Sequence, residues 1–233
     1  IMKFKRANRF ISFSPPWRSK KEERAVLDTL RSSWITTGPK VKEFEEVVAR
    51  YVETKYAVAT FSCTDAMHLA LKVLGIKEGY EVITSTFTFA STAHVICYHR
   101  AKPVFVDVEP DTFNIDYSKI AKKITKRTKA ILPVHFGGHP AEMDGIMNIA
   151  KKNKLFVMDD AAHAIGATYK GEKIGSIADI TCFSFYATKN MTTAEGGMAV
   201  TANMEWARRM RVLTMYGISD AREIWQNRYS KFG

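Results

Sequence analysis

The sequence contains only three cysteines, Cys63, Cys97 and Cys182, among 233 residues. Their odd number and wide spacing exclude a disulfide framework and the short ligand spacings of a structural metal site. This usage is typical of a reducing compartment, and we expect each thiol to behave as a small buried hydrophobic group. We therefore expect neither a disulfide nor a bound metal.

The sequence also lacks an apolar run long enough to span a bilayer. The stretch "IMKFKRANRFISFSPPW" has basic residues, but it has no sustained apolar segment and no small-residue cleavage site. Hydrophobic residues make up 46% and charged residues 25%, which is ordinary globular composition. We expect a cytoplasmic protein that acts without a membrane partner.

Acidic residues are outnumbered, with 24 Asp and Glu against 35 Lys and Arg, and the net charge is +11. Such a balance allows binding to nucleic acid, to a membrane surface or to an anionic small molecule. The basic residues are spread over segments such as "RSKKEER", which carry acids beside them. Solvated helix faces explain this spread better than a nucleic-acid interface.

Short β-rich runs alternate with longer helical runs along the middle of the chain. This rhythm and the nearly continuous apolar strands predict an α/β fold with a mostly parallel sheet covered by helices on both faces. Residues 1–52 fall outside the rhythm and form an arm with lead-in helices, and 218–233 has only a weak helical pattern. We expect strands at 55–60, 80–85, 103–108, 130–135, 155–160, 180–186 and 196–202, and helices at 63–75, 90–100, 116–124, 142–153 and 203–217.

Ligands bind beyond the carboxyl ends of strands in open α/β sheets, so the residues that follow each strand matter most. The turn 62–64 leads small hydroxyl residues into a helix N-terminus, which suits a phosphate group, although an ordinary N-cap explains the same letters. Asp159 and Asp160 end another strand, and one of them could pair with a buried cation. A lone histidine such as His163 is more often a hydrogen-bonded structural residue than a catalytic one.

Lys189 lies in "FSFYATKNMTTAEGG", between an aromatic-serine strand and a Glu-Gly-Gly turn. A lysine amine kept among apolar neighbours has a lowered pKa and can act as a nucleophile. Pyridoxal phosphate needs such a lysine, a carboxylate for its ring nitrogen, a phosphate cradle and a flat group on its ring face. The strand ends supply candidates for the other three: Asp160 or Asp159, the turn 62–64, and Phe87 or Phe89.

Five longer motifs sharpen this hypothesis: "WITTGPKVKEFEE", "STFTFAST", "AKPVFVDVEPDTFNID", "DDAAHAIGATYKGEKIGS" and "CFSFYATKNMTTAEGGMAVT". Together they resemble the sugar-nucleotide aminotransferases of the DegT/DnrJ/EryC1/StrS family, from about Trp34 to Gly217. The resemblance implies the large domain of the type I, aspartate-aminotransferase-like fold. It makes 53–217 the pyridoxal-phosphate-binding domain and 218–233 the start of a connection to a smaller C-terminal domain that this sequence lacks.

The resemblance also implies roles for residues that match the family's motifs. Lys189 would bond to the cofactor's aldehyde and shuttle the proton. Asp160 would hold the ring N–H, and His163 would lie beside the phenolic oxygen. Asp159 stands where a glutamate is more usual and would not be catalytic.

The remaining cofactor contacts implied by the resemblance surround the phosphate and the ring face. Ser184, Cys63 and Thr64 would hold the phosphate, and Phe89 would stack on the ring. Tyr186 stands where the family often has a histidine, which leaves the local substrate contacts open.

The implied reaction is amino transfer from glutamate or glutamine to a keto-sugar nucleotide, by a homodimer. Two alternatives stay open. One is a sugar dehydratase of the same fold, which is disfavoured because that branch replaces the lysine with histidine. The other is a truncated, non-catalytic α/β module that acts through its basic surface.

Overall fold

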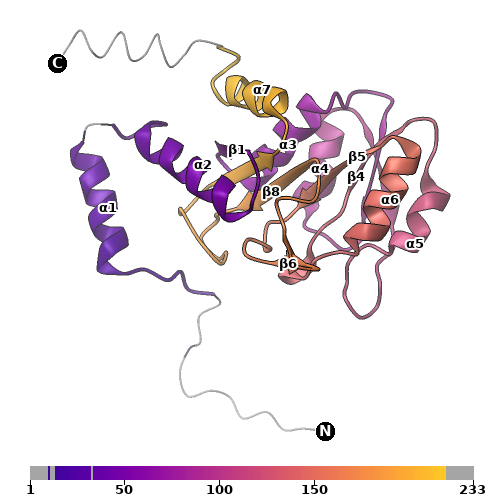
Figure 1. Cartoon of the computed structure of the whole chain (residues 1–233), viewed down its shortest axis with the longest axis horizontal. Helices are drawn as coiled ribbons and strands as arrows, with labels where there is room; N and C mark the ends of the chain where they lie inside the picture. Colours follow the sequence, from indigo (N-terminus) through magenta and orange to yellow (C-terminus); the bar gives the residue numbers. More distant parts are fainter. Residues whose placement is uncertain (1–9, 11–13, 33, 219–233) are drawn as a thin grey trace, which may run out of the picture.

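The computed structural model describes residues 10, 14–32 and 34–218. A seven-stranded sheet in the order β1-β9-β8-β5-β4-β2-β3 forms its centre (Figure 1). Its strands are β1 (Tyr56–Thr60), β2 (Glu81–Ser85), β3 (Lys102–Val106), β4 (Thr128–Leu132), β5 (Phe156–Asp160), β8 (Ile180–Ser184) and β9 (Gly197–Thr201). The helices are α1 (Lys20–Arg31), α2 (Pro39–Tyr51), α3 (Cys63–Val73), α4 (Ala90–Tyr98), α5 (Tyr117–Ile120), α6 (Met143–Asn153) and α7 (Met204–Thr214), with 3₁₀ turns η1 (Ala121–Lys123) and η2 (Phe136–Gly138).

The sheet is mostly parallel, as the sequence predicts. Strands β3, β2, β4, β5 and β8 run parallel, whereas β9 runs antiparallel to β8 and β1 runs antiparallel to β9. The connection from β8 to β9 contains no helix, and an antiparallel return needs no crossover. The start of β9 therefore lies at the same end of the sheet as the carboxyl end of β8.

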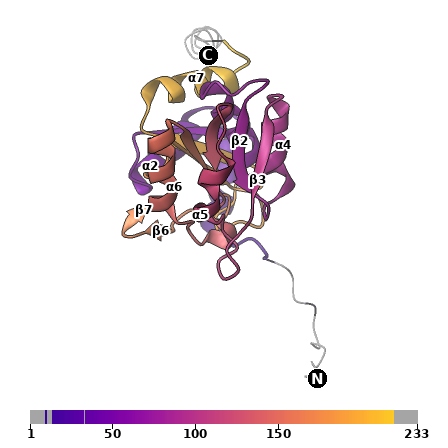
Figure 2. The ribbon, with the colours of Figure 1, turned by 90° about the vertical axis from the view of Figure 1, so that its right-hand side faces the viewer.

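Helices cover both faces of the sheet, which confirms the expected layers (Figure 2). Buried side chains of α3, α4 and α7 pack on one face, and those of α2, α5 and α6 pack on the other. The edge strand β3 departs from the expectation, because Lys102 and Phe105 are exposed. An edge strand has only one neighbour, and its flanks meet solvent.

Three further details differ from the sequence-based expectations. A two-stranded hairpin, β6 (Thr168–Tyr169) and β7 (Glu172–Lys173), was not predicted. It turns through Lys170 and Gly171, both at positive φ. Cys97 is exposed rather than buried, because it lies on the outer side of α4, while Cys63 and Cys182 are buried as expected.

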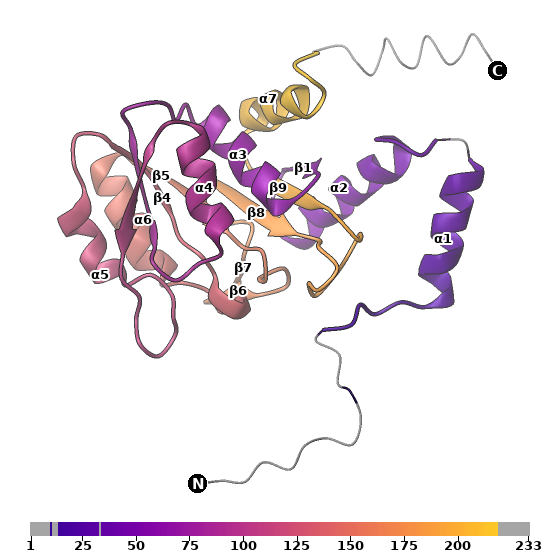
Figure 3. The same ribbon diagram turned by 180° about the vertical axis from the view of Figure 1, so that it is seen from behind.

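Helix α1 extends away from the sheet (Figures 1 and 3) and buries none of its residues. Helix α2, by contrast, packs Val48 and Ala49 into the core. Almost all of the stretch 218–233 lies outside the described residues. No helix within the described ranges is both long enough and apolar enough to cross a membrane. The same ranges contain no group of three His, Cys, Asp or Glu residues that could hold a metal.

Candidate active site

Asp160 ends β5 and points toward the N-termini of α3 and α4. Its buried carboxylate accepts a hydrogen bond at Oδ2 from the Thr92 hydroxyl of α4, at 2.7 Å. Oδ1 accepts from the Ala162 N–H at 3.2 Å and lies 3.9 Å from the Cys63 Sγ of α3. All three donors are neutral, so the carboxylate retains capacity for a cationic partner. The role of Thr92 was missed, because a threonine inside a helical run carries no signal of its own.

Lys189 and His163 meet at the same edge of the sheet. The Lys189 Nζ lies 2.7 Å from the His163 Nε2. Burial lowers the pKa of Lys189, and the nearby Asp160 charge partly offsets this effect. Partial burial also lowers the pKa of His163, with a further contribution from the Lys189 charge. Both shifts favour neutral nitrogens, so this pair can pass a proton between an amine and an imidazole.

The first turn of α3 adjoins these groups. Ser62 caps the helix, since its hydroxyl accepts from the Asp65 N–H at 3.1 Å. Cys63 and Thr64 occupy the first two helical positions, where main-chain N–H groups have no intrahelical acceptor and suit an anion. The Cys63 thiol is fully buried, and that burial raises its pKa well above the ordinary value. Cys63 can therefore offer its main-chain N–H but not a thiolate.

Two further elements border this helix start. The buried Ser184 ends β8, and its hydroxyl accepts from the Tyr186 N–H at 3.3 Å, which leaves its own proton able to reach an anion. Gly197 begins β9 so close to α3 that a Cβ there would lie 2.2 Å from the Ser62 carbonyl carbon and 2.4 Å from the Cys63 nitrogen. The glycine pair at 196–197 is the sequence signal for this close approach.

The two aromatic candidates have different surroundings. Phe89 directly precedes α4, and 79% of it is exposed. Phe87 packs its ring against Phe136 at 4.8 Å and against Phe113 at 5.4 Å between centroids. Phe87 is thus committed to an aromatic cluster, and the stacking role expected for Phe89 stays a prediction.

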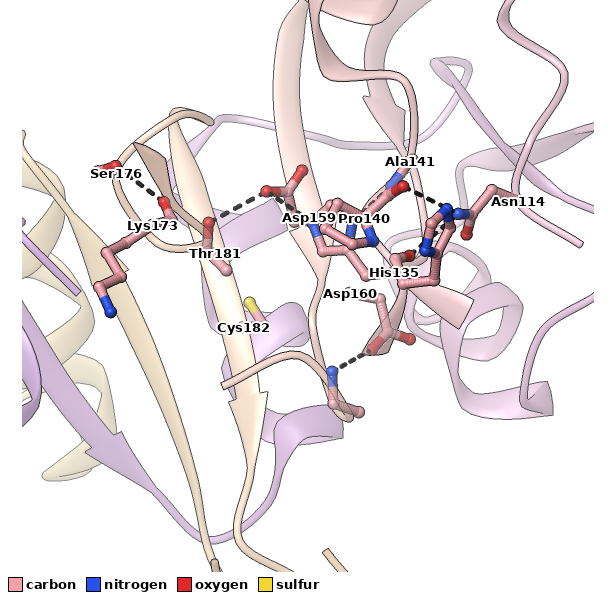
Figure 4. Close-up of polar contacts among 12 residues, drawn as sticks. Asn114, His135, Pro140, Ala141, Asp159, Asp160, Lys173, Ser176, Thr181 and Cys182 are labelled. Carbon is pink, nitrogen blue, oxygen red and sulfur yellow. Dashed lines mark hydrogen bonds and ion pairs between the residues drawn. The ribbon is translucent and has the colours of Figure 1, made fainter. Parts of the chain in front are cut away.

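Asp159 faces the opposite side of the sheet from Asp160, as adjacent strand residues must. Its Oδ2 accepts from the Thr181 hydroxyl at 3.2 Å and lies 3.3 Å from the His135 Nε2 (Figure 4). Sequence reasoning expected Asp159 not to be catalytic, and it noted His135 at the end of the predicted strand 130–135 without giving its side chain a role. The carboxyl end of the sheet therefore brings together the Asp160 carboxylate, the Lys189 amine, the His163 imidazole and the N-terminus of α3. These groups together suit an aldehyde cofactor that carries a ring nitrogen and a phosphate.

Comparisons with known proteins agree with this chemistry. Residues 16–233 match the DegT/DnrJ/EryC1/StrS aminotransferase family. Over 226 residues the chain is 51% identical to the spore coat polysaccharide biosynthesis protein SpsC of Bacillus subtilis, covering 97% of this chain and 57% of SpsC. It is 46% identical to the UDP-4-amino-4-deoxy-L-arabinose–oxoglutarate aminotransferase of Shewanella sediminis, covering 91% of this chain and 54% of that protein.

A solved structure gives the same picture. Spr1654 of Streptococcus pneumoniae in its PLP form superposes with a TM-score of 0.84 and 41% identity, covering 87% of this chain and 57% of Spr1654. The chain thus spans a little over half the length of the relatives that it matches. The type I aminotransferase fold expected from the sequence is confirmed, and the chain belongs to the DegT/DnrJ/EryC1/StrS aminotransferase family.

Proposed function

We propose that the protein is a pyridoxal-phosphate-dependent aminotransferase that transfers an amino group from glutamate or glutamine to a keto-sugar nucleotide in amino-sugar biosynthesis. The observation that carries this proposal is the meeting of Lys189, His163 and Asp160 beside the N-terminus of α3. The names of the relatives support the substrate class, because one acts on a UDP-linked amino sugar with oxoglutarate and another serves polysaccharide biosynthesis.

The residues at this edge fit pyridoxal phosphate. Asp160 is buried, and no ion pair to it is found within the described part of the chain. A protonated ring nitrogen would supply the missing cation. The start of α3 and the Ser184 hydroxyl offer donors for a phosphate, and the glycine at 197 keeps β9 from crowding them.

When bound, this cofactor supplies an electron sink for bond breaking at the α-carbon of the amino donor. Lys189 would take the proton from that carbon onto Nζ and later return it to the product side. The lowered pKa of Lys189 serves this role, because only the neutral amine accepts a proton. Asp160 would hold the proton on the ring nitrogen and thereby keep the ring cationic.

The other site residues would orient and enclose the cofactor. His163 would donate toward the phenolic oxygen through Nε2, the atom that here faces Lys189. The main-chain N–H groups of Cys63 and Thr64 and the Ser184 hydroxyl would hold the phosphate. Phe89 would cover one face of the ring and exclude water from it.

The proposed organisation of the chain follows from the same resemblance. Residues 1–52 form an arm with lead-in helices, 53–217 form the cofactor-binding domain, and 218–233 begin a connection to a smaller C-terminal domain. The relatives extend well beyond the matched stretch, which supports such a further domain. We further propose a homodimer whose site includes residues of both subunits.

The visible absorption spectrum of the purified protein with added pyridoxal phosphate tests this proposal. We expect a yellow band that bleaches when glutamate is added, because the first half-reaction consumes the aldehyde form of the cofactor. A sugar product that lacks nitrogen, formed when a keto-sugar nucleotide is then added, would indicate a dehydratase. No band, together with salt-dependent binding to DNA or RNA, would contradict the proposal in favour of a non-catalytic module.

A further inference from the structure

A pair of titratable side chains lies in the core directly behind the candidate site. The side chains of His135 and Asp159 are both 0% exposed, and the His135 Nε2 lies 3.3 Å from the Asp159 Oδ2. Burying such groups costs free energy unless their contacts compensate. The proposed reaction uses neither side chain, so the burial of this polar pair needs another explanation.

One hydrogen bond to the His135 ring identifies its tautomer. The Ala141 N–H donates to the His135 Nδ1 at 3.1 Å, so this nitrogen is an acceptor and carries no proton. A neutral imidazole then has its proton on Nε2, where it faces the Asp159 carboxylate (Figure 4). The ring therefore bridges the end of β5 and the main chain at Ala141.

The main chain of His135 is tied to Asp160. The His135 N–H donates to the Asp160 carbonyl at 3.0 Å, and the Asp160 N–H donates to the Pro133 carbonyl at 2.9 Å. The Asp159 Oδ2 of the same strand lies 3.3 Å from the imidazole Nε2, without the geometry of a hydrogen bond. Three contacts thus hold β5 to the segment that carries His135, immediately beside the carboxylate expected to meet the cofactor.

The segment 136–141, anchored by the imidazole, also reaches the other side of the site. Gly138 has φ +89°, and a Cβ there would lie 2.7 Å from the His163 carbonyl oxygen. From outside, the Asn114 side chain accepts from the Phe136 N–H and donates to the His139 carbonyl. A shift of this segment would therefore move the main chain of His163.

We propose that His135 is a positioning residue, whose imidazole fixes Asp160 and His163 on the two sides of the cofactor by joining Asp159 to Ala141. This role rests on the cofactor site proposed above. His135 touches neither cofactor nor substrate, and it acts through the main chain that carries those two residues.

Nitrogen NMR of the full chain, labelled at histidine and without added cofactor, tests the first half of the inference. We expect the His135 ring to show the Nε2–H tautomer, with the unprotonated Nδ1 hydrogen-bonded. The reverse tautomer, with the proton on Nδ1, would break the bridge and overturn the inference. This measurement does not depend on the proposed reaction.

Three substitutions separate positioning from space filling. His135→Gln keeps a donor toward Asp159, and His135→Asn keeps an acceptor toward Ala141. His135→Leu keeps the apolar volume but loses both the hydrogen bond from the Ala141 N–H and the polar contact with Asp159. The exposed His94 provides a matched control as His94→Gln.

The measured quantities are the melting temperature and the dissociation constant for pyridoxal phosphate, from an absorbance titration. We expect the Gln and Asn variants to bind about tenfold more weakly and the Leu variant about a hundredfold more weakly, as for residues that orient a ligand's direct contacts. His94→Gln should match the unchanged chain. If the His135→Leu variant fails to fold, the affinities of the His135→Gln and His135→Asn variants, compared with that of the His94→Gln control, still test the positioning role.

A Leu variant that binds as tightly as the unchanged chain would show that the imidazole only fills space, and so would Gln and Asn variants equal to the control. Either result refutes the role of His135 and leaves the proposed function intact. An unchanged chain that binds no pyridoxal phosphate refutes the proposed function, and this role falls with it.

Discussion

Gly197→Ala tests how closely β9 must approach the start of α3. A new Cβ would lie 2.2 Å from the Ser62 carbonyl carbon, 2.3 Å from its oxygen and 2.4 Å from the Cys63 nitrogen. Ordinary contact between heavy atoms lies at about 3.5 to 4.0 Å. All three atoms belong to main chain, so no side chain can rotate away and the strand and helix must separate.

The expected cost follows from this overlap. Glycine to alanine inside a strand would otherwise stabilise the protein by about 0.5 to 1 kcal/mol, so the clash decides the sign. Forced overpacking costs about 1 to 3 kcal/mol, and contact with main chain on both sides indicates the upper end. A loss of about 3 kcal/mol would lower the melting temperature by about 6 to 12 °C in a chain of this size.

Gly196→Ala is the matched control. Its Cβ would lie 2.3 Å from the Thr193 Oγ1, but that hydroxyl belongs to an exposed side chain that can rotate, and the next neighbour, the Phe185 Cβ, is at 3.5 Å. We expect a change below about 1 kcal/mol.

Chemical denaturation gives both stabilities, and titration with pyridoxal phosphate gives the affinities. Gly197→Ala should also weaken cofactor binding, because it displaces the N–H groups at the start of α3. Equal stability and affinity in the two variants would refute this reasoning.

Three further predictions concern the titratable groups. Lys189→Ala should abolish the visible cofactor band while the circular dichroism spectrum stays unchanged; a band that persists would exclude Lys189 as the residue that bonds to the aldehyde. Asp160→Asn should lower transamination far more than Asp159→Ala does, measured per folded protein, and equal losses would contradict the assignment of Asp160 as the partner of the ring nitrogen. Burial lowers the pKa of His99 and of His163 below the ordinary 6.5, so the folded state disfavours their protonated forms. Their contribution to stability is complete above about pH 6.5 and is lost as the pH falls through the lowered values. In urea titrations at about pH 7 and about pH 5.5, His99→Gln should therefore lose less stability on acidification than the unchanged chain, and an equal or larger loss would contradict this assignment.

The sequence predicts the helices and strands, and it predicts which end of the sheet carries the candidate site, because both depend on local patterns. Periodicity places both ends of each major strand within three residues, and the positions at and after strand ends identify Asp160 and Lys189 as candidates. The expected helix 203–217 contracts to Met204–Thr214, because Asn203 serves as its N-cap and the positive φ of Tyr216 and Gly217 ends it.

Other features depend on which strands become neighbours, and local patterns do not carry that information. His135 and Asp159 meet only because β4 and β5 pair, with an isolated bridge between Val134 and Asp160. Thr92 reaches Asp160, 68 residues away in the sequence, only because the start of α4 lies beside the end of β5. The direction of β9 likewise follows from the helix-free connection rather than from its own apolar residues.

Because β1 pairs with β9, it cannot join the sheet until the ribosome has synthesised β9. Tyr56 pairs with Thr201 and Thr60 with Gly197, and β9 is the only strand beside β1 in the described sheet. At ribosomal rates of about 5 to 20 residues per second, β1 waits roughly 7 to 30 seconds for its partner. During this interval it is an open strand edge, available to other nascent chains. The helix start that would hold the phosphate directly follows β1, so the cofactor site cannot be completed until the ribosome has passed Thr201.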